Sequence, residues 1–230
     1  DNYFVKGLGK VKLQKEYDEI EYVINSKNKD FNSNFKIALS ELSLKSQEFL
    51  KNFLPNINDV IILKKHQVEI NYNNDDLLFR GLGKIKLEKE FEKINYSISK
   101  SGNKFNFNTK LDLNKMLLKI DYLNLKKDKN LNAELVVEGI YEKDKGLNLK
   151  KVSILDNDIK IILNNFLLDK ENKIIKVDKI DLDYVDAANK KNEFSIQRKQ
   201  KNDYELKGVV FNANSIIADL LKNKNDDEKS

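Results

Sequence analysis

The chain has 230 residues, of which 40% are hydrophobic and 34% charged, and this balance is typical of a folded protein rather than a disordered one. The absence of cysteine excludes disulfides and thiolate metal sites, and no apolar run approaches the ~18 residues of a membrane-spanning helix. The formal net charge is +5, but 40 of the 42 basic residues are lysine and are interleaved with 37 acidic residues, so we expect no nucleic-acid partner.

The first residues contain no targeting signal. The chain starts at Asp1, and its only methionine is Met116. We therefore expect an internal region excised from a larger protein, with any membrane anchor or targeting segment outside it.

An internal duplication is the strongest pattern in the sequence. Residues 7–24 (GLGKVKLQKEYDEIEYVI) align without gaps with residues 81–98 (GLGKIKLEKEFEKINYSI), and 11 of the 18 positions are identical. The similarity continues more weakly in the same alignment, since Phe31, Ile37 and Leu39 match Phe105, Leu111 and Leu113. The duplication predicts two stacked units, at about 4–54 and 78–125, that extend one continuous surface.

Apolar residues alternate with polar ones along both units. From Val5 to Leu13 every second residue is apolar or glycine, whereas Lys6, Lys10 and Lys12 belong to the other side. This period of two predicts antiparallel strands with one wet face. The same period predicts further strands in the second half, over Met116–Leu125, Leu131–Tyr141, Ile159–Leu163, Ile174–Tyr184, Glu193–Arg198 and Tyr204–Phe211, which gives about a dozen strands in all.

Two segments depart from this alternation. Ser40–Leu54 has apolar residues near helical spacing, with Ser40 as N-cap and Pro55 after its end, and Asn212–Lys224 has one apolar stripe. Both segments predict short α-helices. Because no linker rich in proline, glycine or serine interrupts the chain, we expect a single elongated domain over 1–230, whose C-terminal strands and helix span about 130–224.

The residues that usually carry catalysis are scarce. His66 is the only histidine, and a single histidine without cysteine is more typical of a structural or surface position than of a metal ligand. The carboxylates of Asp178, Asp181 and Asp183 could bind a hard cation, although a solvated strand face is the simpler interpretation. The two Gly-Leu-Gly triplets lack a third glycine and precede no helix, so they predict a bend or bulge, not a phosphate loop. We expect no enzymatic activity, no metal and no cofactor.

The apolar face of such a sheet must be covered. It can close into a barrel, pack against a second sheet, or remain open as a groove for an apolar ligand. Periodicity alone favours a closed sandwich or barrel whose apolar residues are core. Frequent lysine, irregular strand spacing and the two predicted helices argue against an outer-membrane barrel.

Three stretches of sequence resemble the AsmA-like family of bacterial envelope proteins. The stretch LKGVVFNANSIIADLL (Leu206–Leu221) is similar to that family's strand with glycine, then Phe-Asx-Ala and a short apolar helix. The preceding KIIKVDKIDLDYVD (Lys173–Asp186) resembles the strand before it in YhdP-type members. The repeated KGLGKVKL and RGLGKIKL also fit the family's style of β-repeat.

The resemblance implies a mainly β fold, with an elongated, curved, groove-like antiparallel sheet and two short helices. It implies a non-enzymatic segment of a periplasmic phospholipid transporter, attached to the inner membrane of a Gram-negative bacterium by an anchor outside this chain and supporting outer-membrane biogenesis. Phospholipid or another acyl lipid is then the expected ligand, and envelope proteins are candidate partners. The alternative is a closed β-domain that acts as a spacer or interaction scaffold. On the groove hypothesis, the lipid-contacting residues are Ile20, Tyr22, Ile24, Phe35, Ile37, Ile94, Tyr96, Ile98, Phe105, Phe107 and Leu111.

Overall fold

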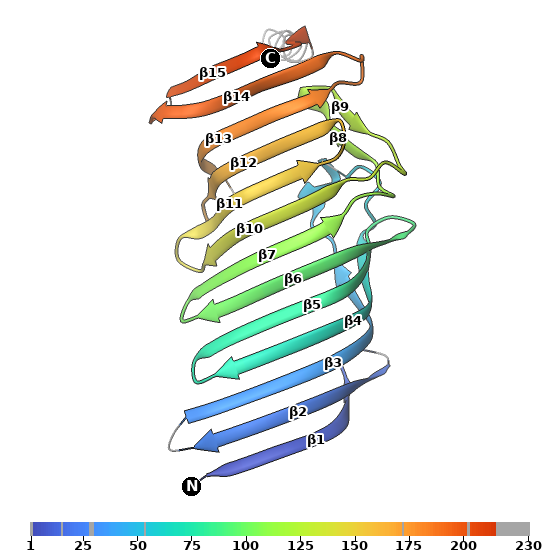
Figure 1. Cartoon of the computed structure of the whole chain (residues 1–230), viewed down its shortest axis with the longest axis vertical. Coiled ribbons are helices and arrows are strands. Elements are labelled where there is room, and N and C mark those ends of the chain that lie inside the picture. Colours follow the sequence, from blue (N-terminus) through green and yellow to red (C-terminus); the bar gives the residue numbers. More distant parts are fainter. Residues whose placement is uncertain are drawn as a thin grey trace, which may run out of the picture.

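A computed structural model describes residues 2–14, 16–27, 30–52, 54–171, 173–201 and 203–214. Within these residues the chain forms one open antiparallel sheet of 13 strands (Figure 1). The strands follow one another in chain order, so each connection is a hairpin or a local excursion. They are β1 (Tyr3–Lys12), β2 (Tyr17–Lys27), β3 (Asp30–Lys45), β4 (Val60–Asn73), β5 (Asp76–Lys86), β6 (Phe91–Ser101), β7 (Lys104–Asp112), β10 (Glu134–Glu142), β11 (Gly146–Leu155), β12 (Ile159–Leu168), β13 (Ile174–Val185), β14 (Lys191–Gln200) and β15 (Asp203–Val210).

The sheet is a ladder of strands with β1 at one end and β15 at the other (Figure 1). A separate two-stranded hairpin, β8 (Leu118–Ile120) and β9 (Leu125–Lys127), lies at one end of the strands. The 3₁₀ helix η2 (Asp121–Leu123) joins these two short strands, and η1 (Glu48–Asn52) lies between β3 and β4. The predicted mainly β, antiparallel fold is therefore confirmed, and the sheet is not closed.

The prediction of a helix over Ser40–Leu54 is wrong. Strand β3 continues to Lys45, and the 3₁₀ helix η1 is the only helical turn among the described residues of that range. Leu42 and Leu44 also fit a period of two, and β4 provides the hydrogen-bonding partner, with Leu42 opposite Leu63 and Leu44 opposite Ile61. Strand pairing thus outweighs the weak helical spacing.

Two further predictions concern Met116–Leu125 and Asn212–Lys224. The first was expected as one strand but is broken by η2, after which Asn124 adopts a left-handed conformation with φ of 48°. Of the second, the predicted helix, only Asn212–Asn214 are described, and residues 215–224 lie outside the described residues. The described part of the chain forms no α-helical element.

The duplication is visible in the pairing of the strands. Tyr22 lies opposite Phe35, and the corresponding Tyr96 lies opposite Thr109, which is the position that matches Phe35 in the alignment of the two copies. Strands β1, β2 and β3 therefore correspond to β5, β6 and β7. The third strands differ in length, because β3 has 16 residues and β7 has 9.

One end of the apolar face is covered by the two excursions that follow β3 and β7. Leu54 and Ile57 come from the first excursion, and Leu113, Met116 and Leu125 from the second, and all five are buried. They pack in one cluster with residues of the sheet from Leu63 in β4 to Phe194 in β14. This cluster is the main hydrophobic core, and among the described residues it leaves the rest of the same face without a covering layer.

Candidate functional site: the open part of the apolar face

A continuous row of uncharged side chains crosses all 13 strands of the sheet. Residues directly opposite each other in neighbouring strands point to the same face, so the pairing registers trace rows across the sheet. The central row runs without a charged residue through Gly9, Ile20, Ile37, Val68, Gly81, Tyr96, Thr109, Val137, Val152, Leu163, Ile180, Ile196 and Leu206.

A row one position away lies on the opposite face and has a different composition. It contains charged residues at both ends and in the middle, among them Lys10, Glu19, Lys110, Asp181 and Lys207. The two faces of the sheet therefore differ in polarity along its entire length, as the alternation in the sequence predicts.

A second apolar row lies beside the central row, on the side away from the covering excursions. We call it the outer row, and most of its side chains are half-buried or exposed. With strands rising about 3.4 Å per residue, the two rows are about 7 Å apart. The outer row consists of Gly7, Tyr22, Phe35, Ile70, Phe79, Ile98, Phe107, Gly139, Leu149, Phe166 and Val177.

The row on the other side of the central row lies under the excursions. We call it the covered row, and its members Ile94, Leu111, Ile161, Leu182 and Phe194 are buried in the main core. The same alternating pattern thus forms a core at one end of the strands and an accessible surface at the other.

The residues predicted to line a groove all lie on the apolar face, in both copies of the duplication. Four of them, Tyr22, Phe35, Ile98 and Phe107, belong to the outer row. Ile20, Ile37 and Tyr96 belong to the central row. Ile24 and Phe105 lie one row further out, toward the uncovered ends of the strands.

Three of the predicted residues are not on the accessible part of that face. Ile94 and Leu111 belong to the covered row, and Ile37 packs with Leu39 and Val68 in a smaller core cluster. The period of two assigns a residue to a face but does not tell which part of the face another segment covers. The sequence interpretation also omitted Ile70 and Phe79 of the outer row, although both fit the period of two. It omitted Leu149, Phe166 and Val177 as well, and these lie three residues from the central row in their strands, so a strict period of two does not assign them to this face.

Aromatic rings lie across the glycines of this face. A Cβ atom at Gly7 or at Gly81 would fall closer than 3.0 Å to the ring of Tyr22 or Tyr96, the residue directly opposite. The same holds for Gly139 with the ring of Phe107. The glycines therefore provide room for rings that lie along the sheet, and neither Gly-Leu-Gly triplet interrupts the pairing with the strand that follows it.

His66 is a structural residue of the sheet. It lies in the bulge between Lys64 and Gln67 and is fully buried. Its Nε2 donates to the carbonyl oxygen of Lys84 at 2.9 Å, which leaves Nδ1 to accept from the hydroxyl of Tyr96 at 3.4 Å. The ring fills the space beside Gly83, where a Cβ atom would fall closer than 3.0 Å to it.

A set of buried polar groups holds the second excursion against the sheet. Lys127 is fully buried, and its Nζ donates to the carbonyl oxygens of Met116 and Asp128, both at 2.9 Å. Burial lowers the pKa of Lys127, although nearby acidic groups oppose that shift. Glu92 accepts from the backbone N–H of Lys115, and burial raises the pKa of its carboxyl group. These groups fix the cover in place and do not line the open surface.

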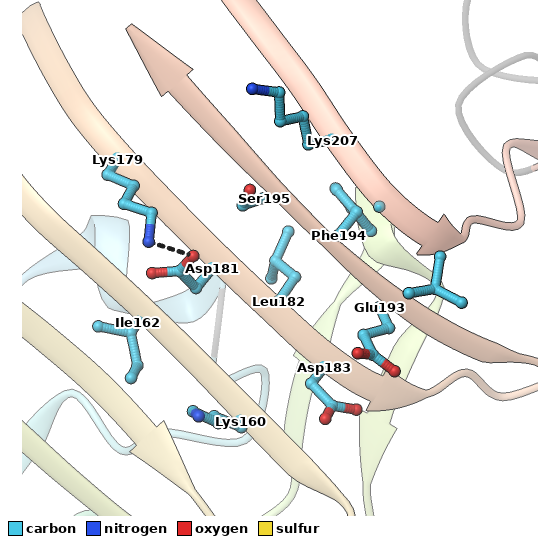
Figure 2. A pocket seen from close by; sticks show the side chains of 12 residues that line it. Lys160, Ile162, Lys179, Asp181, Leu182, Asp183, Glu193, Phe194, Ser195 and Lys207 are labelled. Carbon is cyan, nitrogen blue, oxygen red and sulfur yellow. Dashed lines mark ion pairs between the residues drawn. The ribbon is translucent and has the colours of Figure 1, made fainter.

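A hollow with a volume of about 440 Å³ lies on the polar face, over β12–β15 (Figure 2). Its charged groups include Lys160, Lys179, Asp181 and Glu193, and the Nζ of Lys179 lies 2.8 Å from Oδ1 of Asp181. Because the hollow is shallow and its charges are of both signs, it offers neither an apolar cavity nor a cluster of one charge.

The three aspartates considered as cation ligands are each paired with a lysine. Asp178 pairs with Lys176 at 2.9 Å, Asp181 pairs with Lys179, and Asp183 pairs with Lys191. Within the described ranges, no group of three or more histidine, cysteine or acidic side chains converges as metal ligands would. The part of the chain that the structure describes also contains no helix with the length and hydropathy of a membrane-spanning segment.

Comparisons with known proteins give no independent assignment. No protein-family model matches the chain, and neither a curated protein nor a solved structure is significantly similar to it.

Proposed function

We propose that this chain is a non-enzymatic lipid-binding segment, which holds acyl chains along the open part of its apolar face. The observation that carries the proposal is the pair of neighbouring rows, central and outer, which contain no charged residue. With strands about 4.8 Å apart, the central row is roughly 60 Å long.

The surface suits a ligand that needs area rather than particular polar partners. Tyr22, Phe35, Phe79 and Phe107 contribute rings to the outer row, and Ile98 between the last two is among the exposed apolar residues. Each methylene group sheltered from water contributes roughly 0.8 kcal/mol, so several carbons of an acyl chain suffice for measurable binding. Contiguous apolar surfaces that remain accessible to water often mark the site of an apolar partner.

In the wider context that the AsmA-like resemblance implies, the segment belongs to a periplasmic lipid transporter. There it would form part of a conduit for phospholipid between the inner and outer membranes, with the membrane anchor in another part of that protein. The open sheet supports a groove over the closed β-domain that we considered as a spacer or scaffold.

The direct test is to purify the chain and examine it for co-bound phospholipid by mass spectrometry, and to titrate the lipid-free protein with a fluorescent fatty acid. We expect phospholipid in the purified protein and saturable uptake of the fatty acid. A protein that carries no lipid and takes up no fatty acid would contradict the proposal.

Three substitutions localise the binding. Ile98→Asp places a charge in the outer row and should abolish uptake while the protein stays folded, because this side chain is accessible to water. Ser97→Asp adds the same charge to the neighbouring residue on the polar face, opposite Arg80, and should bind normally. Leu111→Asp in the covered row should unfold the protein, because an unpaired charge in a core is costly. Equal uptake by the Ile98 and Ser97 variants would show that the apolar face is not the binding surface.

A further inference from the structure

One more row of side chains lies along the uncovered margin of the apolar face, one position beyond the outer row. We call it the marginal row, and most of its side chains are aliphatic or aromatic. It consists of Val5, Ile24, Ser33, Tyr72, Leu77, Lys100, Phe105, Tyr141, Leu147, Leu168 and Ile174. Among the described residues that form the central, outer and marginal rows, Lys100 is the one that carries a charge.

The neighbours of Lys100 in the sheet are apolar. Lys100 lies near the end of β6 and is exposed to water. The residues directly opposite it are Leu77 in β5 and Phe105 in β7. The ring of Phe105 in turn lies 6.3 Å from the ring of Tyr141, measured between their centroids. The ammonium group of Lys100 therefore stands at an aliphatic and aromatic margin, where neither cross-strand neighbour provides a negative charge.

Lysines on the polar face of the same hairpin have a different environment. Lys110 forms an ion pair with Glu134. Lys104, four residues after Lys100 and on the polar face, lies directly opposite Glu142 in β10. None of the ion pairs within the described ranges includes Lys100. The protein thus supplies acidic neighbours to these polar-face lysines, whereas a counter-charge for Lys100 has to come from a ligand.

We propose that Lys100 binds the anionic head group of an acyl lipid, which is the phosphate of a phospholipid or the carboxylate of a fatty acid. This inference rests on the proposed lipid-binding function and adds to it a preference for negatively charged head groups. Ile98 and Tyr96 continue from Lys100 into the outer and central rows, at intervals of about 7 Å along β6. An acyl chain can therefore lie over these two side chains while its head group stays in water beside the ammonium group. Lysine suits this position because its flexible stem covers apolar surface and its charged end remains hydrated.

The test compares three probes that share one fluorescent acyl chain and differ in their polar end. The first is the free fatty acid, the second is the corresponding lysophosphatidic acid, and the third is the uncharged methyl ester of the fatty acid. Lys100→Gln should weaken the binding of both anionic probes about fivefold at low salt, because an exposed ion pair contributes modestly, and should leave the methyl ester unaffected. Lys104→Gln removes the same charge from the polar face of the hairpin and should bind all three probes like the unmodified chain.

The outcomes separate this inference from the function on which it rests. If the unmodified chain binds none of the three probes, the lipid-binding function and the role of Lys100 both fail. If it binds them but Lys100→Gln changes nothing, or weakens the methyl ester as much as the anionic probes, the role of Lys100 alone is overturned. Inorganic phosphate without an acyl chain should not displace the probes, and displacement by millimolar phosphate would identify a free anion, in place of a lipid head group, as the ligand of Lys100.

Discussion

The two copies of the duplication begin alike and diverge after their third strand. Strands β1–β3 and β5–β7 pair in the same register when the copies are aligned, but β3 is longer than β7. In the second copy, the corresponding residues leave the sheet and join the excursion that forms β8 and β9. The same repeated pattern thus produces more sheet in one copy and more cover in the other.

This difference shows how one apolar face can be core and surface at once. The excursion of the second copy inserts Leu113, Met116, Leu118 and Leu125 over the covered row. Where no described excursion reaches, the outer row keeps the same apolar composition without a covering layer, and the central row between the outer and covered rows is partly buried. The function that we propose depends on how much of the apolar face the excursions cover, because the apolar composition of the sheet is similar in its covered and open parts.

The cover of the second copy should be the more sensitive to loss of a single lysine. Lys127→Ala removes a fully buried side chain and leaves the carbonyl oxygens of Met116 and Asp128 without their donor. We therefore expect the free energy of unfolding to fall by about 2–4 kcal/mol. Lys51→Ala, in the excursion of the first copy, removes an exposed ion pair with Asp59 and should cost far less. Chemical denaturation measures the free energy of unfolding of both variants, and equal losses of stability would contradict this prediction.

Equivalent glycines should respond differently to the same substitution. Gly83→Ala forces a methyl group against the buried ring of His66 and should cost about 1–3 kcal/mol. Gly9→Ala, at the same position of the first copy, meets only an ordinary contact and should leave the stability nearly unchanged. Thermal unfolding of the two variants is the measurement. A Gly9 variant as unstable as the Gly83 variant would contradict this comparison.

The smallest expected effect is on the pH dependence of stability. Burial raises the pKa of Glu92, so the folded state binds a proton more readily than the unfolded state. This contribution to stability is fully present below the unfolded pKa of about 4.5 and is lost as the pH rises through the raised pKa of the folded state. Glu92→Gln resembles the protonated form, so its stability relative to the wild type should rise between pH 4 and pH 7. A difference that does not change over this range would contradict the prediction.

The sequence predicts most of the sheet because the period of two determines both strand and face. The alternation around Ile20, Tyr22 and Ile24, and its repetition at Ile94, Tyr96 and Ile98, correctly assigns these residues to one side. The duplication further predicts that both copies contribute residues to the same face of the sheet.

The sequence does not predict where the cover lies. Leu113, Met116, Leu118 and Leu125 follow no single period, because their burial arises from a chain that folds back over the sheet. Ile94 and Ile98 have the same local pattern, yet one is core and the other is exposed. This distinction depends on contacts with residues distant in the sequence, which periodicity does not report.

The central claim concerns which face meets the lipid, and a single reporter residue tests it most directly. The chain contains no tryptophan, so Ile98→Trp and Ser97→Trp each place one indole on opposite faces of the same strand. We expect phosphatidylcholine with brominated acyl chains to quench the fluorescence of the Ile98 variant and to leave that of the Ser97 variant unchanged. Equal quenching of the two, or quenching of the Ser97 variant alone, would contradict the account.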